Sequence, residues 1–210
     1  MRILLLRHGE TAGNLEKRYV GRTDEGLTEA AIQALRQTSE KRKQLLYGLL
    51  GPVAAVYASP MRRCLETAAL VFPEKDFSGV PVRLVPGLSE CDFGRFEYKN
   101  YRELSGDADY QRFIDSGGTD GFPGGEAVAQ FKRRCADAFR QEVRTLTEKT
   151  DGTAVFVIHG GSIMAVLEAF GRPEREYYSW QTGCLSGYLC RTGEENGHFC
   201  LTDVAEISII

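Results

Sequence analysis

An arginine and a histidine follow directly on the first apolar run of the chain, where Ile3-Leu4-Leu5-Leu6 gives way to Arg7-His8-Gly9. A guanidinium carries a fixed fork of donors suited to phosphate or carboxylate, and a glycine lets the backbone approach an anion closely. The pattern indicates an anion site that contains a nucleophile or a base. A second interpretation fits these residues equally well when they are taken alone: a buried strand ends in polar side chains, and His8 is a structural histidine.

Two further apolar runs end in the same kind of chemistry. Residues 53–58 lead into Ser59-Pro60-Met61-Arg62-Arg63, and residues 154–158 lead into His159-Gly160-Gly161. Short aliphatic runs without polar alternation are typical of parallel strands that are covered on both faces. The carboxyl ends of parallel strands lie at one edge of a sheet, so we expect these groups to meet in one crevice. His198 falls in a turn instead, and we expect it to be exposed.

The elements around these runs predict a layered fold. One helix is expected from Thr28 to Gly51, with an apolar face formed by Ala31, Leu35, Leu45 and Leu46. Ser59 is expected to cap the next helix, in which Arg63 and Thr67 share one face while Arg62 points away. Later come a strand at 82–85, a helix from Glu126 to about Glu148, a helix from Ile163 to Phe170, and an edge hairpin of strands 185–190 and 199–204 around a turn at 193–197.

Strands that alternate with helices predict an α/β fold in three layers, with a mostly parallel central sheet and helices on both faces. We expect a single domain over residues 1–210, since no linker or repeat divides the chain. Residues 96–125 mix aromatic side chains with Gly and Asp and are expected to form a lid-like insertion. Tyr98, Tyr101 and Phe113 could line such a lid, and packing within the insertion explains them equally well.

Composition restricts the partners. The 210 residues carry a net charge of -3 and are 42% hydrophobic, which favours neither nucleic acid nor a membrane as a partner. No apolar run approaches the roughly 20 residues that span a bilayer, and no leader precedes the first strand, so a cytoplasmic location is expected. The 6 cysteines have no zinc-type spacing and are interpreted as reduced, mostly buried thiols.

Together, several ordered motifs resemble the histidine phosphatase superfamily, the phosphoglycerate mutase-like proteins. They are Arg7-His8-Gly9-Glu10-Thr11 with Asn14, Gly21 and Asp24; Ser59-Pro60 with Arg63 and Thr67-Ala68; Leu88, Glu90 and Gly94; Pro123-Gly124-Gly125-Glu126; and His159-Gly160-Gly161. The sequence departs from the family where Trp is replaced by Gly13, where Gly is replaced by Ala31, where Trp-Glu-Gly is replaced by Phe96-Glu97-Tyr98, and where Arg is replaced by Met164. These positions bear on loop shape and substrate choice.

The resemblance implies that His8 attacks phosphorus and forms a phosphohistidine. Arg7, Arg63 and His159 then surround the transferring oxygens, so no metal or other cofactor is required. Asn14, Gly21 and the Gly160 amide complete the expected substrate-binding set, together with Arg22, which is equally well explained as a solvated loop charge.

Glu90 is the expected general acid, and Asp92 is the alternative. The neighbouring arginines favour ionisation of Glu90, so a useful pKa requires burial or a nearby phosphate.

The resemblance leaves the substrate open. In the insertion Lys99, Arg102 and Arg112 are outnumbered by acidic residues, which disfavours a small, multiply charged phosphosugar acid and therefore a mutase. The length of the chain and its motifs are most similar to α-ribazole phosphatases of cobalamin biosynthesis and to broad-specificity phosphatases. We therefore expect a small-molecule phosphate ester as partner. Phosphoglycerate mutase-type transfer and a non-catalytic phospho-ligand binding protein remain alternatives, and the oligomeric state is open.

Overall fold

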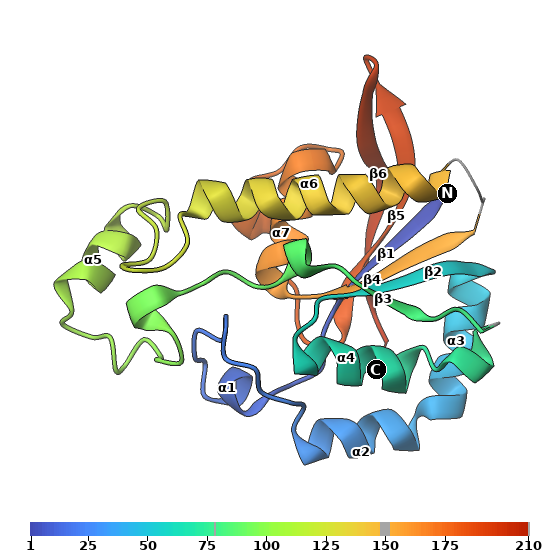
Figure 1. Cartoon of the computed structure of the whole chain (residues 1–210), viewed down its shortest axis with the longest axis horizontal. Helices are drawn as coiled ribbons and strands as arrows, with labels where there is room; N and C mark the ends of the chain where they lie inside the picture. The colour runs from blue at the N-terminus through green and yellow to red at the C-terminus, as the bar shows by residue number, and fades with distance from the viewer. Residues whose placement is uncertain (78, 148–151, 210) are drawn as a thin grey trace.

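The computed structural model describes residues 1–77, 79–147 and 152–209 and shows one six-stranded sheet within them. In spatial order the strands are β3 (Val82–Leu84), β2 (Val53–Ala58), β4 (Thr153–Ile158), β1 (Arg2–Arg7), β5 (Ser186–Glu195) and β6 (His198–Ser208). The strands from β3 to β1 are parallel, and β5 and β6 extend the sheet as an antiparallel hairpin (Figure 1). The predicted α/β class with a mostly parallel sheet is confirmed.

Strand β1 shows why an unbroken apolar run suits the middle of this sheet. Ile3 and Leu5 belong to the core on one face, and Leu4 and Leu6 belong to the core on the other. All four side chains are fully buried. Successive side chains of a strand point to opposite faces, so both faces need apolar residues when both are covered.

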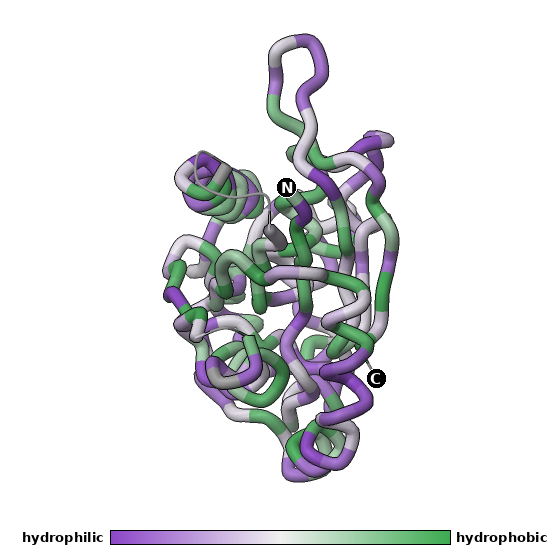
Figure 2. The backbone as a smooth tube through the Cα atoms, turned by 90° about the vertical axis from the view of Figure 1, so that its right-hand side faces the viewer, coloured by the Kyte–Doolittle hydropathy of each residue, from purple (hydrophilic) through white to green (hydrophobic). Residues whose placement is uncertain are grey.

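The helices form two layers, one on each face of the sheet (Figure 1). On one face α6 (Val128–Thr147) and α7 (Gly160–Phe170) supply core residues such as Phe139 and Val166. On the other face α2 (Glu29–Gln37), α3 (Ser39–Leu50) and α4 (Arg62–Val71) supply residues such as Leu35 and Leu46. Figure 2 shows this layering with hydrophobic backbone segments gathered between the layers. Glu148, the expected end of α6, lies outside the described residues.

The expected single helix from Thr28 to Gly51 is wrong, because the chain breaks at Thr38 into α2 and α3. The buried Arg42 folds back onto this break, and its guanidinium donates to the Leu35 carbonyl at 2.7 Å and to the Thr38 hydroxyl at 2.8 Å. The first of these bonds satisfies a backbone carbonyl that the end of α2 leaves open. The break also changes the buried face, so that Leu46 is buried while Leu45 is 51% exposed.

The hairpin of β5 and β6 is confirmed, although its turn is narrower than expected. Glu195 pairs with His198, which leaves Asn196 and Gly197 as the two turn residues, both with positive φ. Positive φ at both positions is the requirement of a tight hairpin turn whose twist matches the strands. The hairpin projects from the body of the molecule (Figures 1 and 2), and His198 is exposed at its tip as expected.

The segment 96–125 folds around a small core of its own. It contains α5 (Ala108–Asp115), and Phe96, Leu104 and Phe113 are buried against Tyr19 and further aromatic rings. Helix α5 stands apart from the sheet, beyond the first turn of α6 (Figure 1). The single-domain interpretation and the lid-like role of this segment stay predictions.

Two general expectations concern thiols and membranes. All 6 cysteines are free, and Cys184 alone of them is not buried, as the composition indicated. Along the described parts of the chain, none of the helices combines the length and the apolarity that a bilayer crossing requires. The cytoplasmic location stays a prediction.

Candidate active site

The ends of three parallel strands meet at one edge of the sheet. The His8 amide donates to the Ile158 carbonyl at 3.0 Å, and the Ser59 amide donates to the Val157 carbonyl at 3.1 Å. These bonds carry the pairing one residue beyond β1 and β2, onto the end of β4. As a result the rings of His8 and His159 lie 5.2 Å apart, centroid to centroid, at an interplanar angle of 67°. The structure therefore brings together the two histidines that are 151 positions apart in the sequence.

His8 is held as a neutral imidazole with a defined tautomer. Its Nδ1 lies 2.7 Å from the Gly9 carbonyl oxygen, which can only accept, so Nδ1 carries the proton. The other ring nitrogen, Nε2, is then left with its lone pair. Burial lowers the pKa of His8 well below its usual value, and the charges of Arg63 and Arg7 lower it further. His8 lines a cavity, so the lone pair is available to a bound ligand.

His159 lies behind His8 and is fully buried. Arg63 Nε donates to His159 Nδ1 at 3.2 Å, and the Ser59 hydroxyl lies 2.7 Å from His159 Nε2. Nδ1 must accept from the guanidinium, so Nε2 carries the proton and donates to Ser59. Burial, Arg63 and His8 together lower the pKa of His159 well below its usual value. The imidazole is therefore neutral and fixed at both nitrogens.

The expectation that Ser59 caps the following helix is wrong. Helix α4 begins at Arg62, and its N-cap Met61 makes no side-chain capping bond. Ser59 lies two residues before that N-cap, and its hydroxyl lies 2.7 Å from His159 Nε2 and accepts a 3.4 Å bond from the Met61 amide instead of an amide of the helix. As expected, Arg63 and Thr67 share the buried face of α4, and Arg62 points outward to pair with Glu66 at 2.7 Å.

Arg63 holds a loop in addition to His159. Its guanidinium donates to the carbonyls of Thr23 at 2.8 Å, Gly21 at 2.9 Å and Val20 at 3.3 Å, and the residue is fully buried. Gly21 thus faces Arg63 with its carbonyl, while its amide donates to Glu97. A Cβ at Gly21 would lie 2.1 Å from the Cys91 carbonyl oxygen, so only glycine fits here.

Arg22 was expected in the substrate-binding set, but its side chain points into solvent. Its side chain is 74% exposed, and it pairs with Asp92 at 3.0 Å. The described residues that line the cavity do not include Arg22, which fits the interpretation as a solvated loop charge.

Arg7 lines the cavity and keeps an unused donor. One guanidinium nitrogen, Nη1, donates to the Thr182 carbonyl at 2.7 Å. Its Nε is buried and has no hydrogen-bond partner among the described residues. A buried donor without an acceptor is costly, so this position favours a bound anion. Gly160, the first residue of α7, lies directly beside it and also lines the cavity.

Glu90 enters the cavity from the loop after β3. The Cys91 amide donates to one carboxylate oxygen at 3.0 Å, and the Gly161 amide donates to the other at 3.1 Å. Burial raises the pKa of Glu90, and this effect outweighs the amide donors, Arg63 and Arg7, which lower it. Burial thus supplies the condition that the sequence alone left open. Glu90 is also the one carboxylate among the described residues that line the cavity.

Asp92, the alternative acid, is engaged elsewhere. One of its oxygens accepts from the Gly94 amide at 3.0 Å, and the other pairs with Arg22.

Asn14 combines two roles that the sequence left as alternatives. It forms a reciprocal capping box with Thr11, and its side chain also lines the cavity.

The cavity has a volume of about 320 Å³, in the range of small-molecule sites. The sequence analysis did not assign a further set of residues that line it, because they lie in loops and a short 3-10 helix without periodicity: Arg18, Tyr19, Tyr177, Tyr178, Gln181 and Thr182. Of the aromatic residues expected in a lid, Phe113 lines the cavity. Tyr98 and Tyr101 are 37% and 48% exposed and lie outside the lining set.

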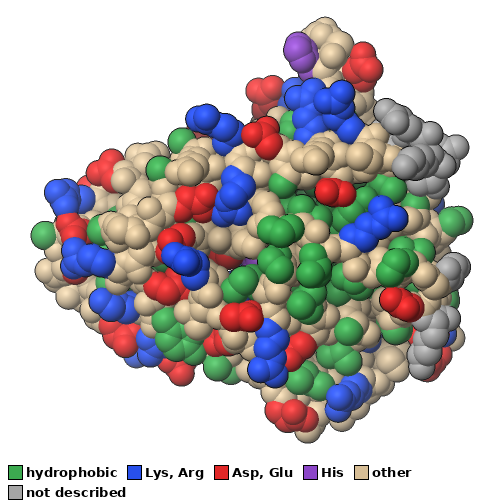
Figure 3. All heavy atoms as spheres, in the orientation of Figure 1, with side chains coloured by type: hydrophobic (Ala, Val, Ile, Leu, Met, Phe, Trp, Pro, Cys, Tyr) green, Lys and Arg blue, Asp and Glu red, His purple; other side chains and the backbone are tan. Residues whose placement is uncertain are grey.

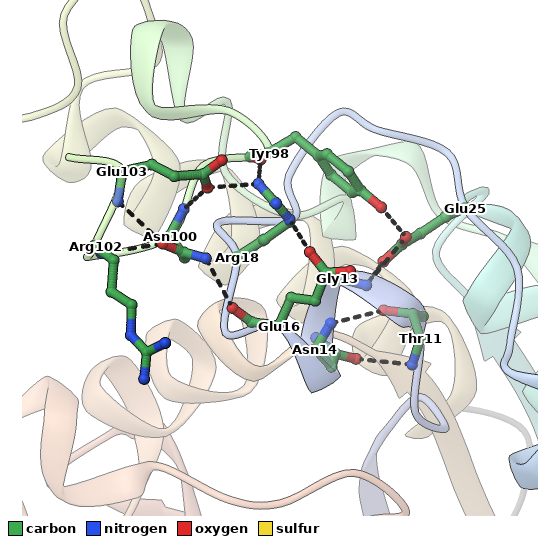
Figure 4. A network of polar contacts seen from close by, with 10 residues as sticks. All are labelled: Thr11, Gly13, Asn14, Glu16, Arg18, Glu25, Tyr98, Asn100, Arg102 and Glu103. Carbon is green, nitrogen blue, oxygen red and sulfur yellow. Dashed lines mark hydrogen bonds and ion pairs between the residues drawn. The ribbon is translucent and has the colours of Figure 1, made fainter.

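A polar network ties the start of the insertion to the segment after β1 (Figure 4). Arg18 Nη1 donates to Glu103 at 2.6 Å and Arg18 Nε to Glu16 at 2.6 Å, while the Tyr98 hydroxyl donates to Glu25 at 3.0 Å. Tyr98 has φ 58°, so it keeps the left-handed conformation for which the family pattern has glycine. Its ring approaches the position that a Cβ of Gly13 would occupy, so two departures from the family pattern lie against each other.

Comparison with known proteins assigns this architecture. A model of the histidine phosphatase superfamily (branch 1) matches residues 3–200. An acid phosphatase of Mycobacterium tuberculosis is 33% identical over 168 residues, 79% of this chain and 73% of that protein. A 2,3-bisphosphoglycerate-dependent phosphoglycerate mutase of Nitrobacter winogradskyi is 29% identical over 171 residues, 79% of this chain and 78% of the mutase. Relatives of both kinds indicate phosphatase or mutase activity.

Proteins named for α-ribazole are also similar. The adenosylcobalamin/α-ribazole phosphatase of Escherichia coli is 33% identical over 104 residues, 50% of this chain and 47% of that enzyme. The α-ribazole phosphatase of Shigella flexneri has the same fold, with a TM-score of 0.73 over 97% of this chain and 96% of that one, at 23% identity. A solved structure of a Mycobacterium tuberculosis open reading frame product gives a TM-score of 0.71 at 30% identity over 97% and 96% of the two chains.

Proposed function

We propose that this chain, which belongs to the histidine phosphatase superfamily, hydrolyses phosphomonoesters through a phosphohistidine. His8, Arg7 and Glu90 line one cavity, as this reaction requires. The observation that carries this proposal is the buried, unpartnered Nε of Arg7, a residue that lines the same cavity as His8. An anion bound there would satisfy the guanidinium donor and stand within reach of a neutral imidazole.

In the first step His8 Nε2 attacks phosphorus, and the bond between phosphorus and the leaving oxygen breaks. The Nδ1 proton stays on the ring, where the Gly9 carbonyl stabilises the positive charge that develops on the imidazole. Glu90 gives its proton to the leaving oxygen, a role that its raised pKa supports. In the second step Glu90, now a carboxylate, takes a proton from water. The water oxygen attacks phosphorus, the bond to His8 breaks, and inorganic phosphate leaves.

The remaining groups act on the charge of the transferring phosphoryl group. Arg7 and the Gly160 amide at the start of α7 act on it together, since a backbone N–H group at a helix start favours anions. Arg63 and His159 support His8 from behind, since the Arg63 charge lies close enough to lower the pKa of both histidines. These charges are fixed by protein hydrogen bonds, so little reorganisation is needed during transfer.

We propose a small phosphorylated metabolite as the substrate, and α-ribazole phosphate is the specific candidate. The similarity to two α-ribazole phosphatases supports this choice, although it reaches only half of the chain in one case and the fold alone in the other. A panel of phosphate esters that includes α-ribazole phosphate, ranked by kcat/KM, tests it. A rank for α-ribazole phosphate below simple alkyl phosphates would reject this candidate while leaving the phosphatase proposal intact.

Phosphoglycerate mutase-type transfer is the second candidate, favoured by the mutase relative that matches 79% of the chain. Release of inorganic phosphate from p-nitrophenyl phosphate, unchanged by EDTA and abolished by His8→Ala, separates a metal-independent phosphatase from a protein that only binds a phospho-ligand. Transfer between the glycerate positions without phosphate release would support the mutase and contradict hydrolysis.

A further inference from the structure

One wall of the cavity is built from aromatic side chains that pack against one another. Phe113 and Phe122 have ring centroids 4.8 Å apart, Phe93 and Phe122 meet edge to face at 4.8 Å, and Tyr19 meets Phe93 at 5.2 Å. All four line the cavity. Three of them belong to the insertion or the loop that leads into it, so this wall lies outside the strand ends that carry His8 and Arg7.

Tyr178 adds a further aromatic ring to the cavity lining, from a different segment of the chain. It lies in the short 3-10 helix Tyr177–Trp180 after α7, and its ring is 55% exposed at the rim of the cavity. Its hydroxyl rests against Gly118 of the insertion, where an added Cβ would lie 2.3 Å from it. Gly118 has φ 81°, so glycine is favoured at this contact on two grounds. An aromatic ring bound in the cavity would therefore meet aromatic side chains from three separate segments.

Of the positively charged side chains that line the cavity, one is already paired with carboxylates. Among the described residues that line it, Arg7 and Arg18 carry the only full positive charges. The guanidinium of Arg18 is paired with the carboxylates of Glu16 and Glu103, both at 2.6 Å (Figure 4). Lys and Arg side chains also alternate with Asp and Glu over the insertion's side of the face in Figure 3, without a continuous basic field. Among the described residues that line the cavity, Arg7 is therefore the cation that is not paired with a carboxylate.

We propose that this site selects phosphomonoesters whose leaving group carries a planar aromatic ring and no second anionic group, an inference that rests on the proposed phosphatase function. The phosphoryl group binds the guanidinium of Arg7, and the aromatic ring of the leaving group lies against the aromatic wall. A carboxylate on the leaving group would be buried among apolar rings beside Glu90 and would find Arg18 already neutralised. An unpaired buried charge is costly, so such substrates are disfavoured.

Three phosphate esters of primary alcohols separate the effects of ring and charge: benzyl phosphate, sn-glycerol 3-phosphate and 3-phosphoglycerate. The last two are close in size and differ by a carboxylate. We expect kcat/KM to fall in this order, by roughly tenfold at each step, as one aromatic contact or one misplaced charge would give. A value for 3-phosphoglycerate equal to or above that for glycerol 3-phosphate would overturn the proposal.

Two substitutions test the residues that carry the argument. Glu103→Gln removes one partner of Arg18, and we expect it to raise kcat/KM for 3-phosphoglycerate relative to benzyl phosphate by roughly threefold to tenfold. Tyr178→Ala, at an exposed position that does not endanger folding, should lower the preference for benzyl phosphate over glycerol 3-phosphate by roughly tenfold. Asp203→Asn removes the carboxylate partner of Arg191 in a long ion pair on the distant hairpin and is the matched control for Glu103→Gln. Substrate ratios unaltered in both test variants would contradict the proposal.

Binding without turnover distinguishes this inference from the proposed function. Calorimetric titration compares benzylphosphonate with 3-phosphonopropionate, neither of which can release phosphate by cleavage of a phosphoester bond. Tighter binding of benzylphosphonate is expected even if the chain fails to hydrolyse any ester, in which case only the phosphatase proposal falls. Tighter binding of 3-phosphonopropionate, together with normal hydrolysis of esters, would overturn the selectivity alone.

Discussion

At the strand ends, His8 and His159 are fixed by hydrogen bonds to the Gly9 carbonyl, Ser59 and Arg63, and both rings are almost fully buried. At the insertion, the walls are aromatic rings, and the polar contacts around Arg18 connect two loops on the surface. The first region holds a few polar groups in fixed protonation states. The second offers shape and apolar surface. In our proposal the first region decides the reaction and the second decides the substrate, so substitutions in the two should differ in kind.

The largest effect is expected for His8→Ala, which removes the nucleophile at the strand ends. We expect kcat to fall by about 10⁴-fold or more for every phosphate ester, because no other group can form the covalent intermediate. Initial rates of p-nitrophenyl phosphate hydrolysis measure this. His198→Ala at the exposed hairpin tip is the control and should behave as wild type. If His8→Ala hydrolysed several esters at rates close to those of the wild type, the phosphohistidine mechanism would be rejected.

Glu90→Gln should lower kcat/KM by about 10²-fold to 10⁴-fold for alkyl phosphates. The active form needs a protonated Glu90, whose pKa is raised, and a neutral His8, whose pKa is lowered. Activity should therefore fall as pH rises through the pKa of Glu90, and fall at low pH only where His8 becomes protonated. The decrease at higher pH should vanish in Glu90→Gln and persist in Asp92→Asn. If the decrease at higher pH persisted in Glu90→Gln and vanished in Asp92→Asn, Asp92 would be the general acid.

Gly161→Ala sharpens the comparison by disturbing the position of Glu90 alone. An added Cβ would lie 2.3 Å from one Glu90 oxygen, so the carboxyl must move. We expect kcat to fall by about 10²-fold for all esters with an unchanged ranking among them. Gly48→Ala in α3, where a Cβ meets open space, is the matched control. It should keep full activity and gain about 0.5–1 kcal/mol of stability. If Gly161→Ala changed the ranking of esters by kcat/KM, the strand-end region would also affect substrate choice, which would contradict the proposed division between the two regions.

The smallest effect on rate is expected for Ser59→Ala. His159 Nε2–H loses its acceptor, and an unsatisfied buried donor costs about 1–3 kcal/mol of unfolding free energy. Denaturant unfolding measures this loss, with the exposed Ser105→Ala as control. The fall in kcat should be smaller than in Gly161→Ala, since the nucleophile and the acid keep their contacts. Unaltered stability would show that this hydrogen bond does not hold His159.

Much of the architecture could be predicted because it follows from local pattern. The apolar runs at 3–6 and 154–158 specify strands that must be covered on both faces, and parallel strands bring their carboxyl ends to one edge. The prediction failed at Thr38, where the inward turn of Arg42 breaks an expected helix. It failed at Ser59 because the helix begins only at Arg62, and the hydroxyl of Ser59 contacts a histidine 100 residues away.

The sequence by itself determined which residues can do chemistry and at which strand ends they stand, since strand periodicity and motif spacing are local properties. Only the tertiary structure decided how each group is tuned. Burial raises the pKa of Glu90 despite two nearby arginines, and Arg63 binds loop carbonyls that no spacing reveals. Desolvation and long-range hydrogen bonds depend on what packs around a group, and the residues that bury Glu90 and line its cavity come from segments far apart in the chain.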